Sequence, residues 1–556
     1  MKTKFYISLF TLLGTLFFAG CSSDRTDDPQ PEPGKIKVGF TMEEKDFGED
    51  IAITRATDTP AKQTYEFGDC EAEVSIARDT TKQSATRTVT FPVHYTIRAY
   101  DQYVLQGELR GTFTSNNSFT PDPGSPAYMS LTSNQTYTFV FFNNDVTLNG
   151  NELDVAASNM TTARIGRENI LINSLSPTIH LTSKPVGCRF RTKIMGRIHF
   201  STPITANVSA NKDIFPQGGG LSLDLSTWTY SCSGTATASV ANNSPATPVS
   251  EFNPANPDYN KNFFGALYYY TSIGDYHSVI PESDAKDIRL NITGGKLYWE
   301  PLNMSLPLSA TSLKLEQGTS YTVTIKLKPS FTYLFSDGST GKFKDSRQGG
   351  GSKTAVAIVV DKGLHLAMAL KQQNDTYWTT VHQHDNVPIN NPVSPPVSIY
   401  DDMNGEHWTW DASGSVDGSI KANEPAKYPA FYAAAHYNPG VPLTGTLATK
   451  RWYLPSLGEV LCLAPLVFET KASIIARGSS GNANAHPLRE AIDQVGGNVE
   501  SSAGGDFFTS TEERPSYYGG YWQVRLFRLP YGQYFLVGTS LYRDYSRLVL
   551  PFIKYQ

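Results

Sequence analysis

A strict alternation of apolar and polar residues in short segments is the feature that most constrains the fold of this chain. Residues 36–42 and 321–327 place an apolar residue at every second position, with many β-branched and aromatic types. Because successive side chains of a strand point to opposite faces of a sheet, this spacing is typical of half-buried strands. Turn-forming clusters separate such segments up to about residue 330, so we expect β-sandwiches rather than a parallel sheet. One face of the first strand carries Ile36, Val38, Phe40 and Met42.

The pattern changes towards the end of the chain. Residues 354–360 read as a buried strand, and Ser456 with Glu459 three positions later forms a capping box before an apolar run. Residues 486–496 place apolar side chains on one helical face and end in a glycine suited to a helix C-terminus. The expected domains are two β-sandwiches, residues 36–182 and 183–330, and an α+β domain, residues 331–556.

The first residues have the layout of a bacterial lipoprotein signal. Two lysines precede an apolar stretch, residues 5–18, which is too short to span a bilayer comfortably, and small residues then lead to Cys21. Lipid on Cys21 would attach the protein to the outer membrane. The alternative is an ordinary signal peptide with a chance cysteine. We expect residues 1–20 to be the signal peptide and the polar, Pro-rich residues 21–35 to be a flexible tether.

Charge and cysteine content restrict the partners. A net charge of −5 over 556 residues, with no basic stripe, argues against a nucleic-acid partner. The cysteines after Cys21 are too few for a disulfide framework, although an exported protein can form a bridge. They are Cys70, Cys188, Cys232 and Cys462.

Enzymatic motifs are missing from the sequence. It contains no nucleophile elbow, HExxH or GxGxxG segment, so no enzyme and no cofactor is expected. His382, His384 and Asp385 could place two histidines on one strand face for a metal, but the sequence points to no third ligand, and a solvated loop is the favoured interpretation. Residues 411–418 have loosely calcium-like spacing, but Ala422 stands where an EF-hand needs glutamate.

Aromatic side chains are the remaining candidates for binding. The segment after residue 513 alternates tyrosines with glycine-rich turns, and aromatic rings in loops give rigid contact area for sugars or proteins. Because strand alternation should bury about half of these rings, we select those beside the turns. The selected ligand-binding residues are Tyr517, Tyr518, Tyr521 and Trp522.

The lipoprotein signal, the first strand, the Thr-Arg-Ala at 54–56 and the two β regions together resemble the fimbrillin family of Bacteroidales pilins. Residues 184–194 and 315–327 look like strands of that family's second domain. The resemblance implies two tandem transthyretin-like β-sandwiches. It also implies that an Arg-specific protease cuts between Arg55 and Ala56, that the first strand is lost, and that another subunit's strand fills the groove. Without the resemblance, Arg55 would be an ordinary loop arginine.

The last part of the chain resembles the Fibrobacter succinogenes major paralogous domain, which has a C-type-lectin-like fold. The residues that carry this resemblance are 451–460, 507–513 and 545–555. Family stalk pilins end in a strand that is donated to the next subunit, whereas here a folded domain occupies that place. The resemblance therefore implies a subunit that accepts a strand without donating one, as at the tip of a fibre.

These features together predict an exported adhesin of the cell surface or fimbrium. Its expected partners are other pilin subunits through strand exchange, and a host glycan or protein. The alternative is a lipoprotein that stays anchored through Cys21 and binds its ligand without polymerising. An enzyme built on the lectin-like fold is the third and weakest hypothesis.

Overall fold

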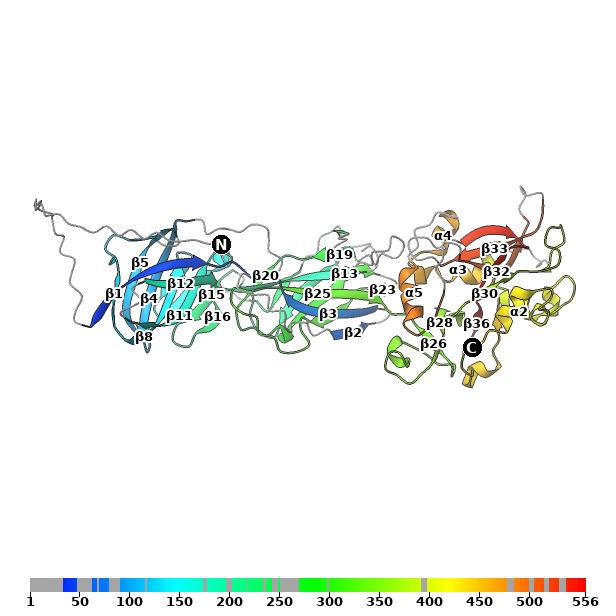
Figure 1. Cartoon of the computed structure of the whole chain (residues 1–556), viewed down its shortest axis with the longest axis horizontal. Coiled ribbons are helices and arrows are strands. Elements are labelled where there is room, and N and C mark those ends of the chain that lie inside the picture. The colour runs from blue at the N-terminus through cyan, green and yellow to red at the C-terminus, as the bar shows by residue number, and fades with distance from the viewer. Residues whose placement is uncertain are drawn as a thin grey trace, which may run out of the picture. The chain divides into compact units, whose positions relative to one another are not determined.

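The computed structural model of the chain describes most residues, and every structural statement below concerns those residues (Figure 1). The chain divides into two compact units. Unit 1 contains residues 1–44, 88–144 and 165–183, and unit 2 contains 45–87, 145–164 and 184–556. The described residues are 34–47, 63–67, 70–79, 91–115, 118–173, 178–196, 203–216, 218–233, 237–242, 249–250, 270–297, 300–391, 398–477, 485–499, 505–514, 520–529 and 537–556.

Unit 1 is a β-sandwich around a single apolar core in its described residues. Side chains at alternate positions of its strands fill the core, among them Ile97, Phe139 and Leu181, each fully buried. The period-two pattern read from the sequence is therefore confirmed here. In sheet order the strands are β6 (Ser118–Pro121), β5 (Val104–Ser115), β4 (Val93–Asp101), β8 (Gln135–Asn143), β11 (Arg164–Ile172), β12 (Thr178–Pro185), β1 (Lys35–Glu44) and β7 (Met129–Thr132).

The first part of unit 2 is a second sandwich with its own core. The predicted strand after Pro185 is β13, and it runs parallel to β25, the strand of residues 321–327. One sheet contains β18 (Val249–Ser250), β19 (Tyr270–Ile273), β13 (Cys188–Gly196), β25 (Ser320–Pro329), β3 (Cys70–Arg78) and β2 (Gln63–Phe67), with β20 (His277–Val279) beside β13. Others contain β16 (Thr229–Ser233), β15 (Gly220–Asp224), β10 (Glu152–Ala156) and β9 (Val146–Asn149); β17 (Ser239–Ala241), β14 (Thr205–Ala210), β21 (Ile288–Gly294) and β24 (Met304–Pro307); and β22 (Lys296–Leu297) with β23 (Glu300–Pro301).

The two sandwiches are interleaved in sequence, which differs from the tandem ranges expected above. Strand β3 precedes β4 in the chain but pairs with β25, so that Ile76 faces Val323. Strand β10 likewise pairs with β15 of the second sandwich. The physical reason is that alternation identifies a strand without specifying its partner, and both sandwiches are built from the same pattern.

The C-terminal domain, residues 331–556, combines two sheets with short helices around buried apolar residues. The strand expected at 354–360 is β28. One sheet contains β27 (Thr340–Gly341), β26 (Tyr333–Phe335), β28 (Ala355–Asp361), β29 (Leu366–Ala369), β36 (Phe552–Lys554) and β31 (Trp452–Tyr453). The other contains β30 (Gln373–Tyr377), β35 (Ser546–Val549), β32 (Asp506–Glu513), β33 (Gln523–Arg528) and β34 (Val537–Tyr542).

Both predicted helices of this domain are confirmed. Helix α3 begins after Ser456. The Ser456 backbone N–H donates to the Glu459 carboxylate at 2.9 Å, as a capping box requires. Helix α5 buries Leu488 and Ile492 completely, and Gly496 beyond it has a φ of 79°. The described helices are α1 (Gly405–Trp410), α2 (Pro429–Ala435), α3 (Leu457–Leu461), α4 (Lys471–Arg477) and α5 (His486–Asp493).

Two further findings concern the membrane and the cysteines. No helix within the described parts of the chain has both the length and the hydropathy needed to cross a bilayer. The four cysteines after Cys21 are free thiols in the structure, and Cys462 packs against the core of the C-terminal domain.

Candidate functional site

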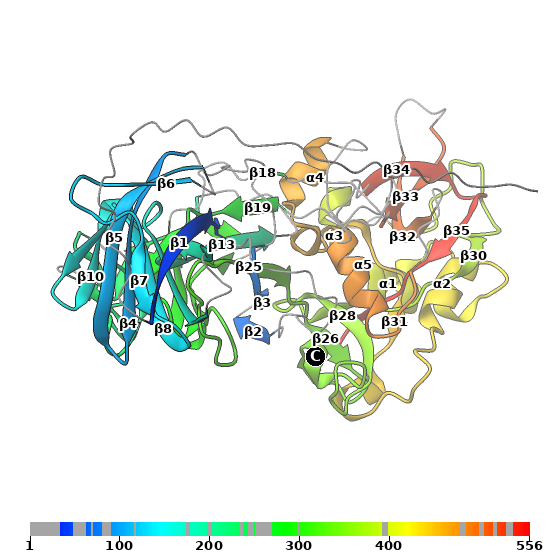
Figure 2. The same ribbon diagram turned by 60° about the vertical axis from the view of Figure 1, so that its left-hand side comes forward.

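Strand β1 is built into unit 1 through two different partners (Figures 1 and 2). Its first half pairs antiparallel with β7, where Lys35 faces Thr132. Its second half pairs parallel with β12, where Gly39 faces Thr178 and Glu44 faces Ser183. Strand β1 therefore connects β7 to the rest of the sandwich, and its removal would leave the pairing edges of both neighbours open.

One face of β1 supplies the core of unit 1. Val38 and Met42 are completely buried, Phe40 is 5% exposed, and the Phe40 ring meets Phe139 edge-on at 5.7 Å between centroids. Ile36 is partly buried against the same core. Burying each such side chain stabilises the fold by roughly 1.5–3 kcal/mol. The four residues predicted on one strand face thus share that face, and without them the core would have a row of apolar pockets.

Polar contacts hold the end of β1 near the point where the chain passes into unit 2. The Tyr95 hydroxyl, which is fully buried, donates to the Glu44 carboxylate and lies 2.7 Å from the Ser183 hydroxyl. Strands β1, β4 and β12 are therefore tied together at this end of the sandwich.

The sequence around Arg55 separates β1 from strands that belong to the other unit. Arg55 and Ala56 lie outside the described residues, between the end of β1 at Glu44 and the start of β2 at Gln63. Strands β2 and β3 belong to the second sandwich. A cut after Arg55 would consequently leave β1 held in unit 1 by non-covalent contacts alone.

In the C-terminal domain, two of the three segments that carry the resemblance, residues 451–460 and 507–513, meet in a buried polar network. The Ser510 N–H donates to the Pro455 carbonyl at 2.7 Å, and the Leu457 N–H donates to the Thr511 hydroxyl at 2.8 Å. Asp402 joins them, because its carboxylate accepts the Thr511 hydroxyl at 2.6 Å. These hydrogen bonds join the two motifs inside the domain.

Glu459 is the most deeply buried carboxyl of this network. It accepts from the Ser456 N–H at 2.9 Å and from the Tyr453 hydroxyl at 3.0 Å, and Lys554 Nζ lies 3.6 Å away. Burial nevertheless raises the pKa of Glu459 to about 7, against the lowering effect of these partners. The C-terminal domain thus contains a carboxyl that titrates near neutral pH.

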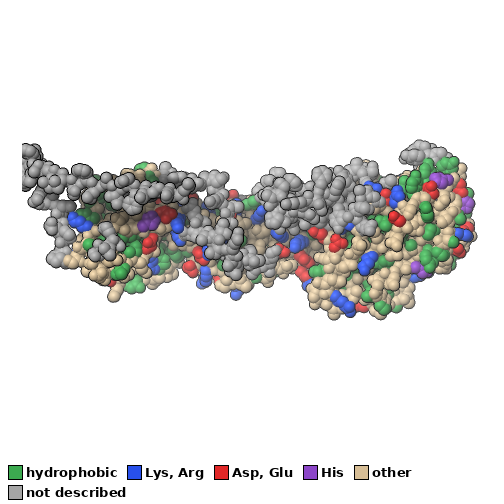
Figure 3. All heavy atoms as spheres, viewed as in Figure 1, with side chains coloured by type: hydrophobic (Ala, Val, Ile, Leu, Met, Phe, Trp, Pro, Cys, Tyr) green, Lys and Arg blue, Asp and Glu red, His purple; other side chains and the backbone are tan. Residues whose placement is uncertain are grey.

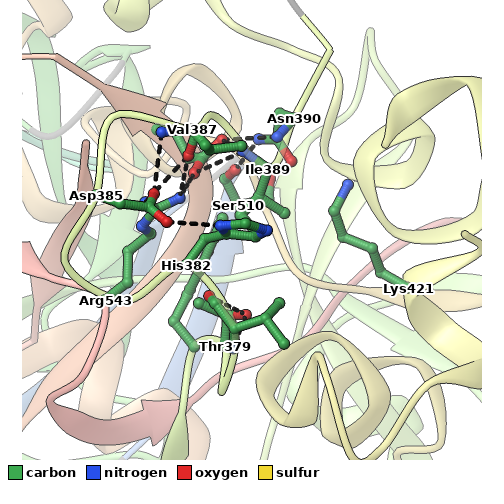
Figure 4. Close-up of polar contacts among 12 residues, drawn as sticks. Thr379, His382, Asp385, Val387, Ile389, Asn390, Lys421, Ser510 and Arg543 are labelled. Atoms are coloured by element: carbon green, nitrogen blue, oxygen red, sulfur yellow. Dashed lines mark hydrogen bonds and ion pairs between the residues drawn. The ribbon is translucent and has the colours of Figure 1, made fainter. Parts of the chain in front are cut away.

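A buried ion pair fixes the 381–391 loop, which follows β30 (Figure 4). Arg543 is completely buried and donates to the Glu512 carboxylate at 2.9 Å and to the Val387 carbonyl at 3.1 Å. Glu512 also accepts the backbone N–H groups of Ile389 at 3.0 Å and Asn390 at 2.7 Å. Burial raises the pKa of Glu512, and Arg543 is the strongest opposing influence. The loop is therefore held in one position by charges inside the domain.

Asp385, His382 and His384 add further polar contacts that hold the loop. Asp385 accepts from Arg543 at 3.3 Å and lies 2.6 Å from the His382 ring nitrogen. Burial acts to raise the pKa of Asp385, but the hydrogen bonds from the Val387 N–H and the His382 ring contribute to a net lowering of this pKa. His384 pairs instead with Asp544, at 2.6 Å.

The fixed loop borders an exposed aromatic surface, which we call the aromatic end. Tyr521 is 38% exposed and contacts the Tyr542 ring at 6.3 Å, while His384 lies 4.9 Å from the same ring. Figure 3 shows hydrophobic and histidine side chains on the exposed surface of this domain. The aromatic end comprises Tyr377, His384, Tyr521, Tyr542 and Tyr545.

Two of the four selected binding residues lie within the described residues. Tyr521 is on the aromatic end, and Trp522 is half-buried beside it, with its backbone N–H 3.4 Å from the Asp385 carbonyl. Tyr517 and Tyr518 lie outside the described residues, as does Cys21. Sequence reasoning missed Tyr377, Tyr542 and Tyr545, because strand pairing between distant segments brings them together.

The possible metal ligands do not converge. His382 and His384 pair with different carboxylates, Asp385 and Asp544. Within the described residues no three His, Cys, Asp or Glu side chains are placed to hold a metal ion.

Comparisons with known proteins give weak structural likenesses. No family model and no curated protein matches the chain. A solved fimbrial protein from Bacteroides ovatus is 10% identical, with 94% of this chain and 99% of that chain covered and a TM-score of 0.25. A candidate cell adhesion protein from Bacteroides uniformis is 12% identical, with 54% of this chain and 99% of that chain covered and a TM-score of 0.27. Likenesses this weak carry nothing further about this chain.

Proposed function

We propose that this chain is an adhesive subunit of a fimbria, placed at the tip, which accepts a strand from a neighbouring subunit in the position of β1. The observation that carries the proposal is the position of β1 itself. It supplies Val38, Phe40 and Met42 to the core, and it is joined to the strands that follow it through the segment that contains Arg55. Cleavage after Arg55 would open a groove for another strand with the same alternation.

The burial of strand β36 supports the placement at the tip. Strand β36 pairs with both β29 and β31, and its Phe552 and Ile553 are completely buried within the C-terminal domain. This strand is therefore committed to its own fold, and the chain would accept a strand without offering β36 in exchange. The aromatic end would then be presented for contact with a glycan or protein.

The test of processing is the N-terminal sequence of the protein in sheared surface material, with Arg55→Ala as the variant. We expect the wild-type protein to begin at Ala56 and to be found in fibres. The variant should fold normally, because the substitution leaves the apolar residues of both cores unchanged, and should be absent from fibres. Incorporation of Arg55→Ala at the wild-type level would contradict the proposal.

A test of the groove uses the full chain with the Arg55–Ala56 bond replaced by a site for a sequence-specific protease. After cleavage, labelled peptide KIKVGFTMEE, which is strand β1, should exchange into the protein, whereas uncleaved protein should not bind it. A peptide with Val38, Phe40 and Met42 changed to serine is the matched control, because it keeps length and charge but loses the core face. Failure of the labelled peptide to bind cleaved protein would overturn strand acceptance.

The second candidate is a lipoprotein anchored permanently through Cys21. The observation in its favour is that unit 1 with β1 in place is a complete fold whose core needs no partner. Recovery of acylated, uncleaved chains as the sole surface form would favour this candidate.

A further inference from the structure

The turn between β4 and β5 has an unusual residue at its centre. Asp101 and Val104 face each other across the hairpin, and the two residues between them, Gln102 and Tyr103, have φ values of 43° and 74°. A two-residue hairpin turn with both φ values positive strongly favours asparagine and glycine. For a residue with a Cβ the left-handed conformation costs roughly 1–2 kcal/mol. Folding of the hairpin therefore gives no reason for a tyrosine at this position.

The side chains at this turn are also unused by unit 1. Tyr103 is 71% exposed, Val104 is 62% exposed and Leu105 is 44% exposed, so three consecutive large apolar residues face solvent. Leu171 on β11 is a fourth, at 53% exposure. Large apolar side chains exposed on consecutive residues are a feature of interaction surfaces.

This hairpin lies at the end of unit 1 where β1 begins. The Gln135 side chain bonds to Asp101 beside the turn, and the neighbouring Asn134 N–H donates to the Ile172 carbonyl at 2.6 Å. The Ser133 N–H donates to the Gly34 carbonyl, just before β1, at 3.0 Å. The exposed hairpin tip, Leu171 and the start of β1 are thus at the same end of the sandwich.

At the opposite end of unit 1 the chain passes into unit 2. The crossings in described residues follow Glu44, Asn144, Arg164 and Ser183. They gather around Tyr95, which bonds Glu44 and Ser183 and faces Asn143 across the sheet. A strand taking the place of β1 must join its own subunit at one end of the groove, and the end free of these crossings is the one beside Gly34.

We propose that the hairpin tip, Tyr103 to Leu105, together with Leu171, is a docking surface for the folded body of the neighbouring fimbrial subunit whose strand occupies the β1 groove. This inference rests on the proposed strand acceptance. The groove would bind the donated strand, and the hairpin would bind the apolar surface from which that strand leaves. The retained tyrosine at positive φ is explained as a contact residue.

The direct experiment is site-specific photo-crosslinking in assembled fibres. Tyr103 is replaced by p-benzoylphenylalanine, which keeps the aromatic ring, and Leu364, 48% exposed in the C-terminal domain, is the control position. After irradiation and shearing, we expect position 103 to crosslink to another fimbrial subunit, identified by mass spectrometry, and position 364 not to do so. Crosslinks from position 103 only to residues 21–33 of the same chain, to a host protein or to nothing would overturn the inference.

A second experiment separates this inference from the proposed function. The double variant Gln102→Asn, Tyr103→Gly carries the residues that the turn prefers, so it should fold at least as well as the wild type. We expect cleaved double variant to bind the KIKVGFTMEE peptide like the wild type but to enter fibres at least tenfold less. Equal entry with normal peptide binding would overturn the docking surface alone, whereas failure of cleaved wild-type protein to bind the peptide would overturn strand acceptance.

Discussion

Strand β1 of unit 1 and the 381–391 loop of the C-terminal domain are held in place by opposite means. Strand β1 is held mainly by apolar side chains at alternate positions, Val38, Phe40 and Met42, against the sandwich core. The loop is held by the buried pair Arg543 and Glu512, with backbone groups completing their hydrogen bonds. Apolar contact is non-directional, so any strand with the right period can replace β1. A buried ion pair requires specific positions of its charges and hydrogen-bond partners, so another segment cannot replace this loop.

The largest effect should follow from breaking the buried pair. Arg543→Met removes the ion-pair partner of the buried Glu512, and removal of one partner of such a pair costs roughly 3–5 kcal/mol. We expect the midpoint of urea unfolding to fall for the C-terminal domain and to stay constant for unit 1. Arg451→Met, at an arginine whose side chain is 51% exposed, is the control and should change stability by less than about 1 kcal/mol. Equal effects of the two substitutions would remove the contrast.

Strand β1 should tolerate replacement as long as its core face is kept. A peptide KIKVGFTMEE with alanine in place of Phe40 loses the contact with Phe139 and should bind the cleaved protein with about 100-fold lower affinity, corresponding to about 3 kcal/mol. A peptide with Lys37→Gln, on the other face, should bind like the parent. Fluorescence anisotropy titrations measure both affinities, and a similar loss for both peptides would contradict selection by the core face.

The stability of the C-terminal domain should also depend on pH. Glu459 has a pKa raised from 4.5 to about 7 by burial, so the folded state binds more protons than the unfolded state between these values. The unfolding free energy of the C-terminal domain should therefore fall as pH rises from 4.5 to 7, by of order 2–3 kcal/mol.

The matched variants for this pH effect are Glu459→Gln and Asp375→Asn. The first should flatten the fall in unfolding free energy, while the second, at an exposed carboxyl, should leave it as in the wild type. Thermal unfolding followed across this pH range provides the measurement. An unchanged slope in Glu459→Gln would show that other carboxyls, such as Glu512, dominate the titration.

The smallest change in stability is expected at the aromatic end. Tyr521→Ala removes one ring contact with Tyr542, and such pairs contribute roughly 0.5–1.5 kcal/mol. Binding to a glycan array and to immobilised host surface proteins should nevertheless be lost, with Leu364→Ala as the control for an exposed apolar residue. Binding retained by Tyr521→Ala would move the ligand surface away from the aromatic end.

The sequence allowed the local strands and helices of this fold to be predicted, but not the pairing of the strands with one another. The period-two segments identified β1 and β25, and the Ser456–Glu459 capping box identified α3. Local spacing determines such elements, so they can be read from one chain. The spacing within β3 could not assign this strand to the second sandwich, because an alternating strand can pack against either core equally well.

The candidate site was predictable to a similar extent. Tyr521 was selected from its place beside glycine-rich turns, and the face of β1 was selected from its period. Arg543 gave no signal, since an arginine between Tyr542 and Asp544 in a short connection between strands reads as a surface residue until its burial against Glu512 is seen. Contacts across long sequence distances are decided by packing, which one sequence does not display.

The interleaving of the two units determines how the molecule would carry tension. The chain passes between them five times, and loss of everything before Ala56 would leave four of these connections, near residues 87, 144, 164 and 183. A pulling force on the C-terminal domain would be divided among four covalent connections between the units instead of acting on a single linker. If the proposed donor strand fills the groove, it would have only non-covalent contacts, so a pulling force would release that strand before it separated the two units.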